Sequence, residues 1–414
     1  MKTASGKEQT SVLMYSPDSI GLGHMRRNSA IATGLAKVLP GVSNLLLVGS
    51  SAGAYFELPP GTDCIKLPSI LKTGRNEWSP KSLNVPREVA RNLRSRIIAE
   101  TAKAFAPDVF LVDHVPSGIW DELVPALKSL HGSSRRPRLV LGLRDILGAP
   151  EDVREHWAAS GIYDLIDTYY DKILIYGSPD IFPACEAYGL RKRFADRITY
   201  CGFIHFGQRP KTQAEARSEL GVGAKPLIVM TAGGGHDAHP MMRFVLNVLR
   251  MKQPLQNFDL VVIAGPLMPL AEHTEIEAMT KQLGAAFIVS TPRLQTYLSA
   301  ADTVLTMGGY NTVMETIAVG VPTIVVPRSG PSAEQRYRAR LFADLGLIQY
   351  VDLENNSDVD LMAAIEHALG SARKGTPALA FDGIANAANE LAGLAVRTTQ
   401  RAEKPVLVQE TVAA

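Results

Sequence analysis

Short, continuously apolar runs that alternate with amphipathic stretches constrain the fold of this 414-residue chain more than any other feature. In the first half the runs are Val12–Tyr15, Leu45–Val48, Val109–Val112, Leu139–Leu143, Ile173–Tyr176 and Ile198–Tyr200. In the second half they are Leu227–Met230, Leu260–Ala264, Phe287–Val289, Thr303–Thr306 and Thr323–Val326. Strands without polar alternation are covered on both faces, so the pattern predicts parallel sheets with helices on each side.

The segments between the runs have the spacing of amphipathic helices, in which apolar residues recur every three or four positions. The expected helices include residues 24–38, 86–105, 117–130 and 383–396. Strands that alternate with helices form a doubly wound sheet, because each helix covers a face of the sheet that its strands build. The sequence therefore predicts an α/β protein made of Rossmann-like units.

The alternation stops and restarts once, at the polar segment of residues 205–216. A chain of 414 residues is also too long for one ordinary core, so two domains are expected. We predict two Rossmann-like domains with doubly wound parallel sheets that face a cleft, joined by a linker at 205–212. The expected parts are an N-terminal domain at 1–207, a C-terminal domain at 208–380, a helix at 381–398 that can cross back to the first domain, and a flexible tail at 399–414.

The composition limits the class of function. Apolar residues make up 46% of the chain and charged residues 20%, as in soluble globular proteins, and a net charge of +2 argues against a nucleic-acid partner. Cys64, Cys185 and Cys201 lack the spacing of a disulfide framework or a zinc site, which favours a reducing compartment. No signal peptide is evident, and no apolar run approaches the roughly 20 residues of a spanning helix. We expect a cytoplasmic protein with at most peripheral membrane contact on the inner face.

The stretch from Met307 to Arg340 is the most informative motif. A Gly308-Gly309 turn precedes a helix that carries Glu315, and the last helix of the stretch begins with Glu334-Gln335. Because parallel strands end at the same edge of a sheet, we expect backbone N–H groups, a carboxylate and an amide around one crevice. This combination predicts a site for a nucleotide that carries phosphates and a sugar, in which Glu315 accepts hydrogen bonds from both ribose hydroxyls. An ordinary surface glutamate is the alternative interpretation of Glu315.

Two further features of the second half fit a phosphate site. Asn311 or Thr312 is expected to cap the helix after the Gly-Gly turn, and the N-terminus of that helix favours a phosphate. The loop Gly233-Gly234-Gly235-His236 follows a strand, and its glycines let backbone N–H groups approach an anion. The loop has neither the ending of a Walker A motif nor the spacing of the dinucleotide fingerprint. A tight turn without a ligand is the alternative interpretation.

His236, Asp237 and His239 have the composition of a metal cluster but lack a further ligand set. We expect His236 to contact the phosphate of the nucleotide and expect no metal.

In the first half, a strand enters the turn Gly21-Leu22-Gly23-His24, and a helix begins near His24. The ordinary pKa of an imidazole suits a general base, so His24 is the first candidate to take a proton from a hydroxyl group. A helix cap or a group that positions the acceptor is the alternative role. Asp113 follows the apolar run Val109–Val112. It is either a rival base or the carboxylate that orients His24.

The same region carries other charged residues with two possible roles. Arg26 and Arg27 either meet a phosphate or lie on a solvated helix face. Further cleft candidates are His114, Arg144 and Asp145.

These motifs resemble those of the GT-B glycosyltransferases. Residues 303–340 are most similar to the donor-binding half of the MurG-like type with a family 28 C-terminal domain, and the resemblance extends over nearly the full chain. The first Gly-rich turn departs from the MurG pattern, which has a longer run of glycines. Gly-Leu-Gly-His followed by two arginines, with Asp113-His114 and Arg144-Asp145, is similar to a bacterial branch of predicted glycosyltransferases.

The resemblance implies a role for each motif. Glu315 would bind the ribose hydroxyls, and Glu334 and Gln335 would contact the hydroxyls of the transferred sugar. Arg293 and Leu294, with Pro292, would lie at the nucleobase of the nucleotide. The residues implied at the diphosphate are Gly233, Gly234, Gly235, His236, Gly308, Gly309, Asn311 and Thr312.

The implied reaction is an inverting, metal-independent transfer of a hexose from a nucleotide sugar to an acceptor hydroxyl. The nucleotide sugar is a co-substrate, expected to be a UDP sugar and by analogy UDP-GlcNAc, and no other cofactor is expected. The acceptor is unidentified and is a small molecule, a glycan or a lipid-linked molecule with a free hydroxyl. The alternatives are a non-hydrolysing UDP-sugar 2-epimerase of the same fold and a binding module without catalysis. The N-terminal half with its Gly-Leu-Gly-His turn favours transfer over the epimerase. The presence of His24, Asp113, Glu315 and Gln335 argues against a binding module.

Overall fold

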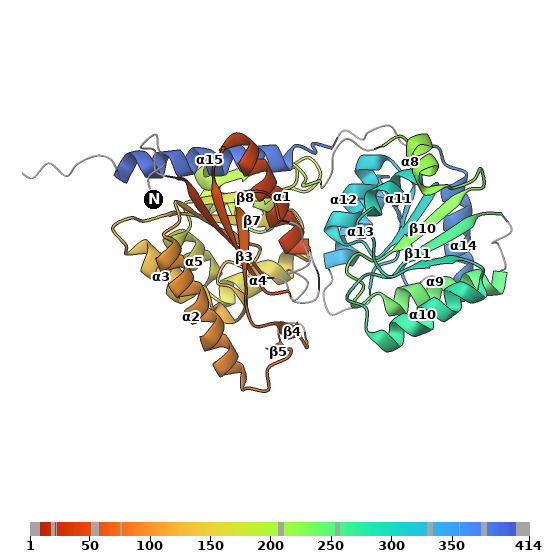
Figure 1. Ribbon diagram of the computed structural model, residues 1–414, viewed down its shortest axis with the longest axis horizontal. Helices are drawn as coiled ribbons and strands as arrows, with labels where there is room; N and C mark the ends of the chain where they lie inside the picture. The colour runs from red at the N-terminus through yellow and green to blue at the C-terminus, as the bar shows by residue number, and fades with distance from the viewer. Residues whose placement is uncertain are drawn as a thin grey trace, which may run out of the picture.

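The computed structural model of the chain describes residues 9–17, 21, 23–50, 58–74, 77–205, 211–252, 257–328, 334–355, 357–373 and 379–402. In these residues the strands form two parallel sheets and one short antiparallel hairpin. Each sheet lies at the centre of one half of the molecule, with helices on both of its faces (Figure 1). The predicted α/β architecture of two Rossmann-like sheets is confirmed.

The first sheet has the strand order β3-β2-β1-β6-β7-β8-β9, and all of its neighbouring strands are parallel. Its strands are β1 (Ser11–Ser16), β2 (Ser43–Val48), β3 (Thr62–Lys66), β6 (Val109–Asp113), β7 (Arg138–Arg144), β8 (Lys172–Tyr176) and β9 (Ile198–Tyr200). The hairpin pairs β4 (Ile70–Lys72) with β5 (Trp78–Pro80). The central strands are buried almost throughout, which explains their continuous apolar sequence.

Helices α1 and α15 lie together on one side of the first sheet, and α2, α3 and α5 pack together on the other (Figure 1). The helices of this half are α1 (Gly23–Val38), α2 (Arg87–Phe105), η2 (Ile119–Asp121), α3 (Val124–His131), α4 (Pro150–Ala159), α5 (Ile162–Tyr169), α6 (Ala184–Ala187), α7 (Arg191–Phe194) and η3 (Ala195–Arg197).

The second sheet has the strand order β12-β11-β10-β13-β14-β15. Its strands are β10 (Leu227–Thr231), β11 (Asp259–Ile263), β12 (Ala286–Ile288), β13 (Thr303–Thr306), β14 (Thr323–Val325) and β15 (Gln349–Tyr350). Helices α9, α10 and α14 contribute to the core on one face, and α8 and α11 to the core on the other. The helices are α8 (Gln213–Leu220), α9 (His239–Lys252), α10 (Leu270–Gln282), α11 (Leu294–Ala300), α12 (Tyr310–Val319), α13 (Glu334–Asp344), α14 (Asp358–Leu369) and α15 (Gly383–Ala402).

The last helix, α15, follows the second sheet in the chain but packs against α1, β6 and β7 of the first half (Figure 1). The two helices approach closely at Gly34, where an added Cβ would lie 2.8 Å from the Ile384 side chain. A glycine at this point therefore sets the distance between α1 and α15. The predicted domain limits stay a prediction, since residues 206–210 of the expected linker and 403–414 of the expected tail lie outside the described residues.

One helix predicted from the sequence is wrong. Residues 117–130 form the short η2 and a separate α3 instead of one helix, because Gly118, Trp120 and Asp121 all have positive φ. The apolar-run criterion also missed β3 and β15. The edge strand β3 is only partly buried and β15 has 2 residues, so neither produces a long apolar run.

Among the residues that the structure describes, no helix is long and apolar enough to cross a membrane.

Candidate functional site

The topology of both sheets places the predicted site residues at equivalent positions. The strand order reverses between β1 and β6 in the first sheet and between β10 and β13 in the second. Ligands of open α/β sheets bind outside the carboxyl ends of the strands at such reversals, because the crossover helices diverge there. His24 and Asp113 follow β1 and end β6, and the loops at Gly233 and Gly308 follow β10 and β13.

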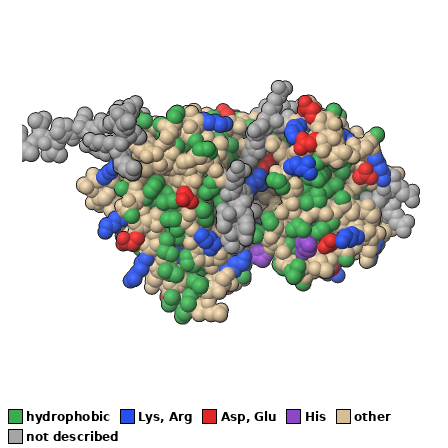
Figure 2. Space-filling view, viewed as in Figure 1, with side chains coloured by type: hydrophobic (Ala, Val, Ile, Leu, Met, Phe, Trp, Pro, Cys, Tyr) green, Lys and Arg blue, Asp and Glu red, His purple; other side chains and the backbone are tan. Residues whose placement is uncertain are grey.

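The structure brings the site residues of the first half and those of the second half together. Asn311 Nδ2 of α12 donates to the Gly23 carbonyl at 3.3 Å, and the Arg144 and Arg26 guanidinium groups pair with Glu334 and Glu315 across the junction. Histidine and basic side chains lie near the junction of the two halves on the face that Figure 2 shows. The residues of both halves that join these contacts therefore form one site.

His24 and Asp113 are in direct contact. His24 Nδ1 lies 2.8 Å from Asp113 Oδ2, and the Asp113 side chain is fully buried. Burial opposes the ionisation of Asp113, but the nearby Arg27 guanidinium and His24 outweigh it and hold the pKa of the carboxyl well below its ordinary value. Burial also lowers the pKa of His24, although Asp113 opposes this effect. At neutral pH the pair is thus a neutral imidazole and a carboxylate. Arg27 Nη2 also lies 2.9 Å from Nδ1, but it already donates to both Asp113 oxygens, so we assign the Nδ1 proton to the contact with Asp113, and Nε2 is the nitrogen that can accept a proton.

Arg27 fixes the Asp113 carboxylate. Its Nη2 donates to both carboxylate oxygens at 2.8 and 2.7 Å, and its Nε donates to Oδ1 at 3.2 Å. The guanidinium lies 5.4 Å from the Tyr176 ring centroid and 5.9 Å from that of Tyr310. Arg27 is only 1% exposed, so the role expected for it on a solvated helix face is wrong, and contact with a phosphate stays a prediction. It is a buried group that holds Asp113.

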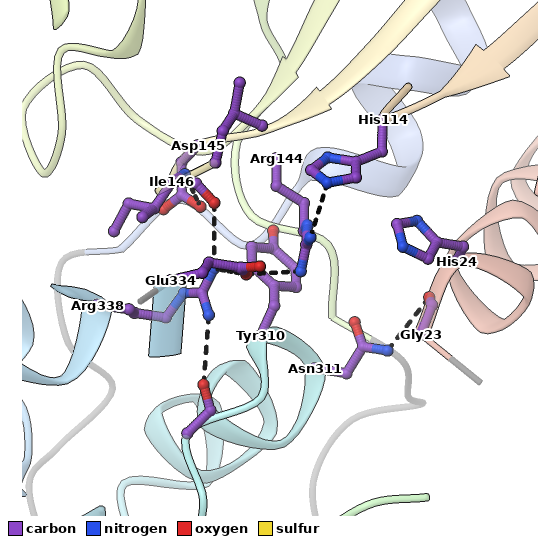
Figure 3. A network of polar contacts seen from close by, with 12 residues as sticks. Gly23, His24, His114, Arg144, Asp145, Ile146, Tyr310, Asn311, Glu334 and Arg338 are labelled. Carbon is purple, nitrogen blue, oxygen red and sulfur yellow. Dashed lines mark hydrogen bonds and ion pairs between the residues drawn. The ribbon is translucent and has the colours of Figure 1, made fainter. Parts of the chain in front are cut away.

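His114 and Arg144 form the next layer of this wall (Figure 3). Arg144 Nη2 lies 3.1 Å from His114 Nε2, and because a guanidinium can only donate, Nε2 is the acceptor and Nδ1 carries the proton. Burial lowers the pKa of His114 well below its ordinary value, which agrees with a neutral ring. His114 has φ of 70°, a left-handed conformation that is uncommon outside glycine, and its ring lies 5.2 Å from that of His24.

The loop after β10 is built for close backbone approach. Gly233 and Gly235 have positive φ, and a Cβ on Gly235 would lie 2.3 Å from the Ala264 carbonyl oxygen. Only glycine fits this packing against the neighbouring loop of Gly265. A Cβ on Gly233 would lie 3.7 Å from Thr312 Oγ1, so this loop and the start of α12 are adjacent.

The start of α12 differs from the expectation in one respect. The N-cap is Gly309, and no side chain caps the helix, so Asn311 and Thr312 lie within its first turn. The prediction that one of them is the cap is wrong, because the cap is Gly309 and the helix already begins at Tyr310. The uncapped backbone N–H groups at this N-terminus suit an anion, as expected for the residues after Gly308.

Glu315 lies in the second turn of α12 and is 1% exposed. Arg26 Nη2 of α1 donates to Glu315 Oε1 at 2.8 Å, while Oε2 is buried without a partner among the described residues. Burial raises the pKa of Glu315, and the Arg26 guanidinium counteracts this effect.

Glu334 connects the two halves at the start of α13 (Figure 3). Its Oε1 accepts from Arg144 Nη1 at 2.6 Å and from Arg338 Nη2 at 2.7 Å. Burial opposes ionisation, but the two guanidinium groups outweigh it and hold the pKa of Glu334 well below its ordinary value. The neighbouring Gln335 has a buried Oε1 without a partner in the described part of the chain.

The remaining predicted residues lie further from this centre. Arg293 precedes α11 and Leu294 begins it, at the carboxyl end of the edge strand β12, where Arg293 is exposed. His236 lines a cavity of about 330 Å³ together with Met307 and Arg328.

His236, Asp237 and His239 do not converge as a metal site would require. Asp237 pairs with Arg328, and His239 Nε2 lies 2.9 Å from Glu275 Oε2. No group of three or more His, Cys, Asp or Glu side chains among the described residues is placed to hold a metal ion.

Sequence reasoning missed two residues that organise the site. Tyr310 donates its hydroxyl to the Tyr176 carbonyl at 3.1 Å and accepts from the Ile204 amide at 3.1 Å. Arg338 is 1% exposed and lies 5.6 Å from the Tyr310 ring centroid (Figure 3). A tyrosine after a Gly-Gly turn and an arginine four residues after Glu334 were visible signals, but neither reveals a contact between halves.

Comparisons with known proteins match one part of the chain to a family model and the whole chain to a known fold. Residues 228–390 match the family described as glycosyltransferase family 28 C-terminal domain. Curated relatives include the UDP-N-acetylglucosamine–N-acetylmuramyl-(pentapeptide) pyrophosphoryl-undecaprenol N-acetylglucosamine transferases of Acidothermus cellulolyticus (29% identical over 140 residues, 33% of this chain and 37% of that protein) and Caldanaerobacter subterraneus (27% over 159 residues, 37% and 43%). The chain thus spans about two fifths of the length of these curated relatives in the matches.

Solved structures match nearly the whole chain. They include Acinetobacter baumannii MurG (TM-score 0.55, 13% identical, covering 95% of this chain and 100% of that one) and the kitacinnamycin glycotransferase (0.57, 17%, 96% and 98%). A proposed UDP-N-acetylglucosamine 2-epimerase of Listeria monocytogenes has a TM-score of 0.61 at 13% identity, with 97% and 99% covered. These likenesses show the GT-B fold, which transferases and an epimerase share.

Proposed function

Because residues 228–390 belong to the glycosyltransferase family 28 C-terminal domain family, we propose that this GT-B protein transfers a hexosyl group from a UDP sugar to an acceptor hydroxyl. The transfer inverts the anomeric carbon and uses no metal ion. The names of the curated relatives support UDP-GlcNAc as the sugar donor and a lipid-linked glycan as one class of acceptor. A protein of this kind works in the cytoplasm, with peripheral contact to the inner face of a membrane when the acceptor is lipid-linked.

The observation that carries the proposal is the His24–Asp113 pair opposite the glycine loops of the second sheet. In the reaction, the acceptor oxygen attacks the anomeric carbon, and the bond from that carbon to the diphosphate oxygen breaks. The bonding electrons leave with the diphosphate, and the hydroxyl proton goes to His24 Nε2. Asp113 stabilises the imidazolium that forms, since its Oδ2 lies 2.8 Å from Nδ1.

The geometry favours His24 over Asp113 as the base. The Asp113 carboxylate is fully buried, and both of its oxygens already accept hydrogen bonds from Arg27. A carboxylate whose pKa is held well below its ordinary value is a weak proton acceptor, whereas a neutral imidazole accepts a proton near neutral pH. Asp113 therefore positions His24.

The second half supplies what the leaving diphosphate needs. The N-terminus of α12 and the loop at Gly233 offer backbone N–H groups, which stabilise the negative charge as it develops. Glu315 accepts hydrogen bonds from the ribose hydroxyls, and Glu334 and Gln335 contact the hydroxyls of the transferred sugar. Arg293 and Leu294 lie at the nucleobase of the donor, and His236 lies near its phosphates. A site that stabilises the leaving group in this way has no need of a metal ion.

The alternative, a UDP-sugar 2-epimerase, is favoured only by the fold likeness to the Listeria protein. Incubation with UDP-GlcNAc and no acceptor distinguishes the two functions. We expect slow release of UDP without isomerisation, whereas formation of the C2 epimer would replace the transferase proposal.

The base is tested in the same assay with an acceptor panel of small-molecule, glycan and lipid-linked hydroxyls. His24→Ala is expected to lower kcat about 10²–10⁴-fold with little change in donor binding. His156→Ala, at an exposed position of α4, is the matched control and keeps wild-type activity. Equal kcat values for His24→Ala and the wild type would contradict the assignment.

A further inference from the structure

Glu315 is closed to ligands in the arrangement that the structure shows. The residue is 1% exposed, and a carboxylate that binds both hydroxyls of a ribose needs both of its oxygens. Oε1 accepts from Arg26 Nη2 at 2.8 Å, and Oε2 is a buried acceptor without a partner among the described residues. Buried polar atoms in native proteins are almost always paired, so an orphaned oxygen here points to a missing hydrogen-bond donor.

The group that occupies Glu315 comes from the opposite wall of the site. Arg26 lies in the first turn of α1, in the first half of the molecule, whereas Glu315 lies on α12 in the second half. The Arg26 side chain is 27% exposed and that of Glu315 is 2% exposed. The arginine is therefore the solvent-facing member of the pair, and a nucleotide that reaches Glu315 has to move it.

We propose that Arg26 occupies the ribose-binding carboxylate in the free protein and moves its guanidinium to the diphosphate when the nucleotide sugar binds. This inference rests on the proposed function, because it takes Glu315 as the group that binds ribose. The two ribose hydroxyls replace the guanidinium as hydrogen-bond donors to Glu315. The diphosphate in turn replaces Glu315 as the anionic partner of Arg26.

The distances allow this exchange within one side chain. Thr312, in the first turn of α12, precedes Glu315 by three residues, which is about 4.5 Å along a helix axis. Asn311 contacts Gly23 at 3.3 Å, so the first turns of α1 and α12 already lie side by side (Figure 3). A shift of the guanidinium by about one helical turn thus brings it to the N-terminus of α12, where a phosphate is favoured.

The exchange makes opposite predictions for a nucleoside and for its diphosphate. A nucleoside has the ribose but no phosphate, so it must displace Arg26 and gains nothing from the released guanidinium. A nucleoside diphosphate displaces the same group and then binds it. Arg26 consequently weakens nucleoside binding and strengthens diphosphate binding.

The test compares Arg26→Gln with the wild type by titration calorimetry, using uridine and UDP and then the nucleosides and diphosphates of the other bases. Because burial raises the pKa of Glu315, the titrations are run at about pH 8, which favours its ionised form more than a neutral pH does. In Arg26→Gln we expect uridine to bind about fivefold more tightly and UDP about tenfold more weakly. Arg91→Gln, at an exposed position of α2, removes the same charge and is expected to change neither affinity by more than about twofold.

A double-mutant cycle separates this exchange from a general charge effect. In a Glu315→Gln background, Arg26→Gln should no longer tighten uridine binding, because no carboxylate remains for Arg26 to occupy. Unchanged or weaker uridine binding in Arg26→Gln, together with UDP binding by the wild type, would overturn the exchange and leave the proposed function standing. A wild-type protein that binds no nucleoside diphosphate would overturn both.

Discussion

Replacement of Asp113 by asparagine should lower both the stability of the protein and its activity. The substitution keeps the size of the side chain but removes the charge that faces Arg27, which is 1% exposed and donates three hydrogen bonds to this carboxylate. Removal of one partner of a buried ion pair costs about 3–5 kcal/mol, because the remaining charge stays buried. The asparagine oxygen still accepts one bond and the Tyr176 and Tyr310 rings still flank Arg27, so we expect about 3 kcal/mol.

Tryptophan fluorescence measures this change in the relevant half of the molecule. Trp78, Trp120 and Trp157 are the three tryptophans of the chain, and all lie in the first half. With a urea m-value of about 2–3 kcal/mol/M, a loss of 3 kcal/mol lowers the unfolding midpoint by about 1–1.5 M. Activity should fall about 10²–10⁴-fold, because asparagine no longer stabilises the imidazolium of His24.

The control is the double variant Arg27→Met, Asp113→Asn. It removes the uncompensated cation, so stability should return to within about 1 kcal/mol of the wild type while activity stays low. The pH dependence gives a second check. Since the folded-state pKa of Asp113 lies below its unfolded value of about 4, its contribution is present above that pH and is lost as the pH falls through the folded-state pKa. The Asp113→Asn curve should be flatter in that window. An Asp113→Asn protein as stable as the wild type, or recovery of activity in the double variant, would refute the reasoning.

Three further outcomes are expected. Because burial lowers the pKa of His24, the acid limb of the kcat/KM profile should lie below about pH 6.5, and a limb above pH 7 would contradict a neutral imidazole base. Glu315→Ala should raise the KM for the nucleotide sugar about tenfold or more with a nearly unchanged kcat, measured by initial rates, whereas an unchanged KM argues against ribose binding. Glu334→Gln leaves Arg144 and Arg338 without the carboxylate they share, so calorimetry should show that the free energy of unfolding falls by about 3–5 kcal/mol. An unchanged free energy of unfolding would show that the ion pairs of Glu334 are solvated.

Some features of the fold were accessible from local sequence and others were not. The central strands were identified because burial on both faces demands an apolar run, as in β1 and β6. The edge strand β3 was missed because its residues are partly exposed. The break between η2 and α3 was also missed, because Trp120 adopts a left-handed conformation that nothing in the local pattern requires.

The same division holds for the site. Gly233, Gly308, His24 and Asp113 were found because glycine turns and polar residues at strand ends have local sequence signals. The buried state of Arg27 and the role of Tyr310 depend on which groups meet in the folded chain, and those contacts join residues more than 80 positions apart.

The sequence by itself determined the two parallel sheets, the position of each loop at a strand end and the chemical groups available there, since periodicity and turn chemistry are local properties. Only the tertiary structure decided how these groups are paired. Arg26 forms an ion pair with Glu315, Arg27 with Asp113, and Arg144 with Glu334. The chain holds many carboxylates that could pair with each arginine. Which carboxylate an arginine meets depends on burial and distance, which exist only once the chain is folded.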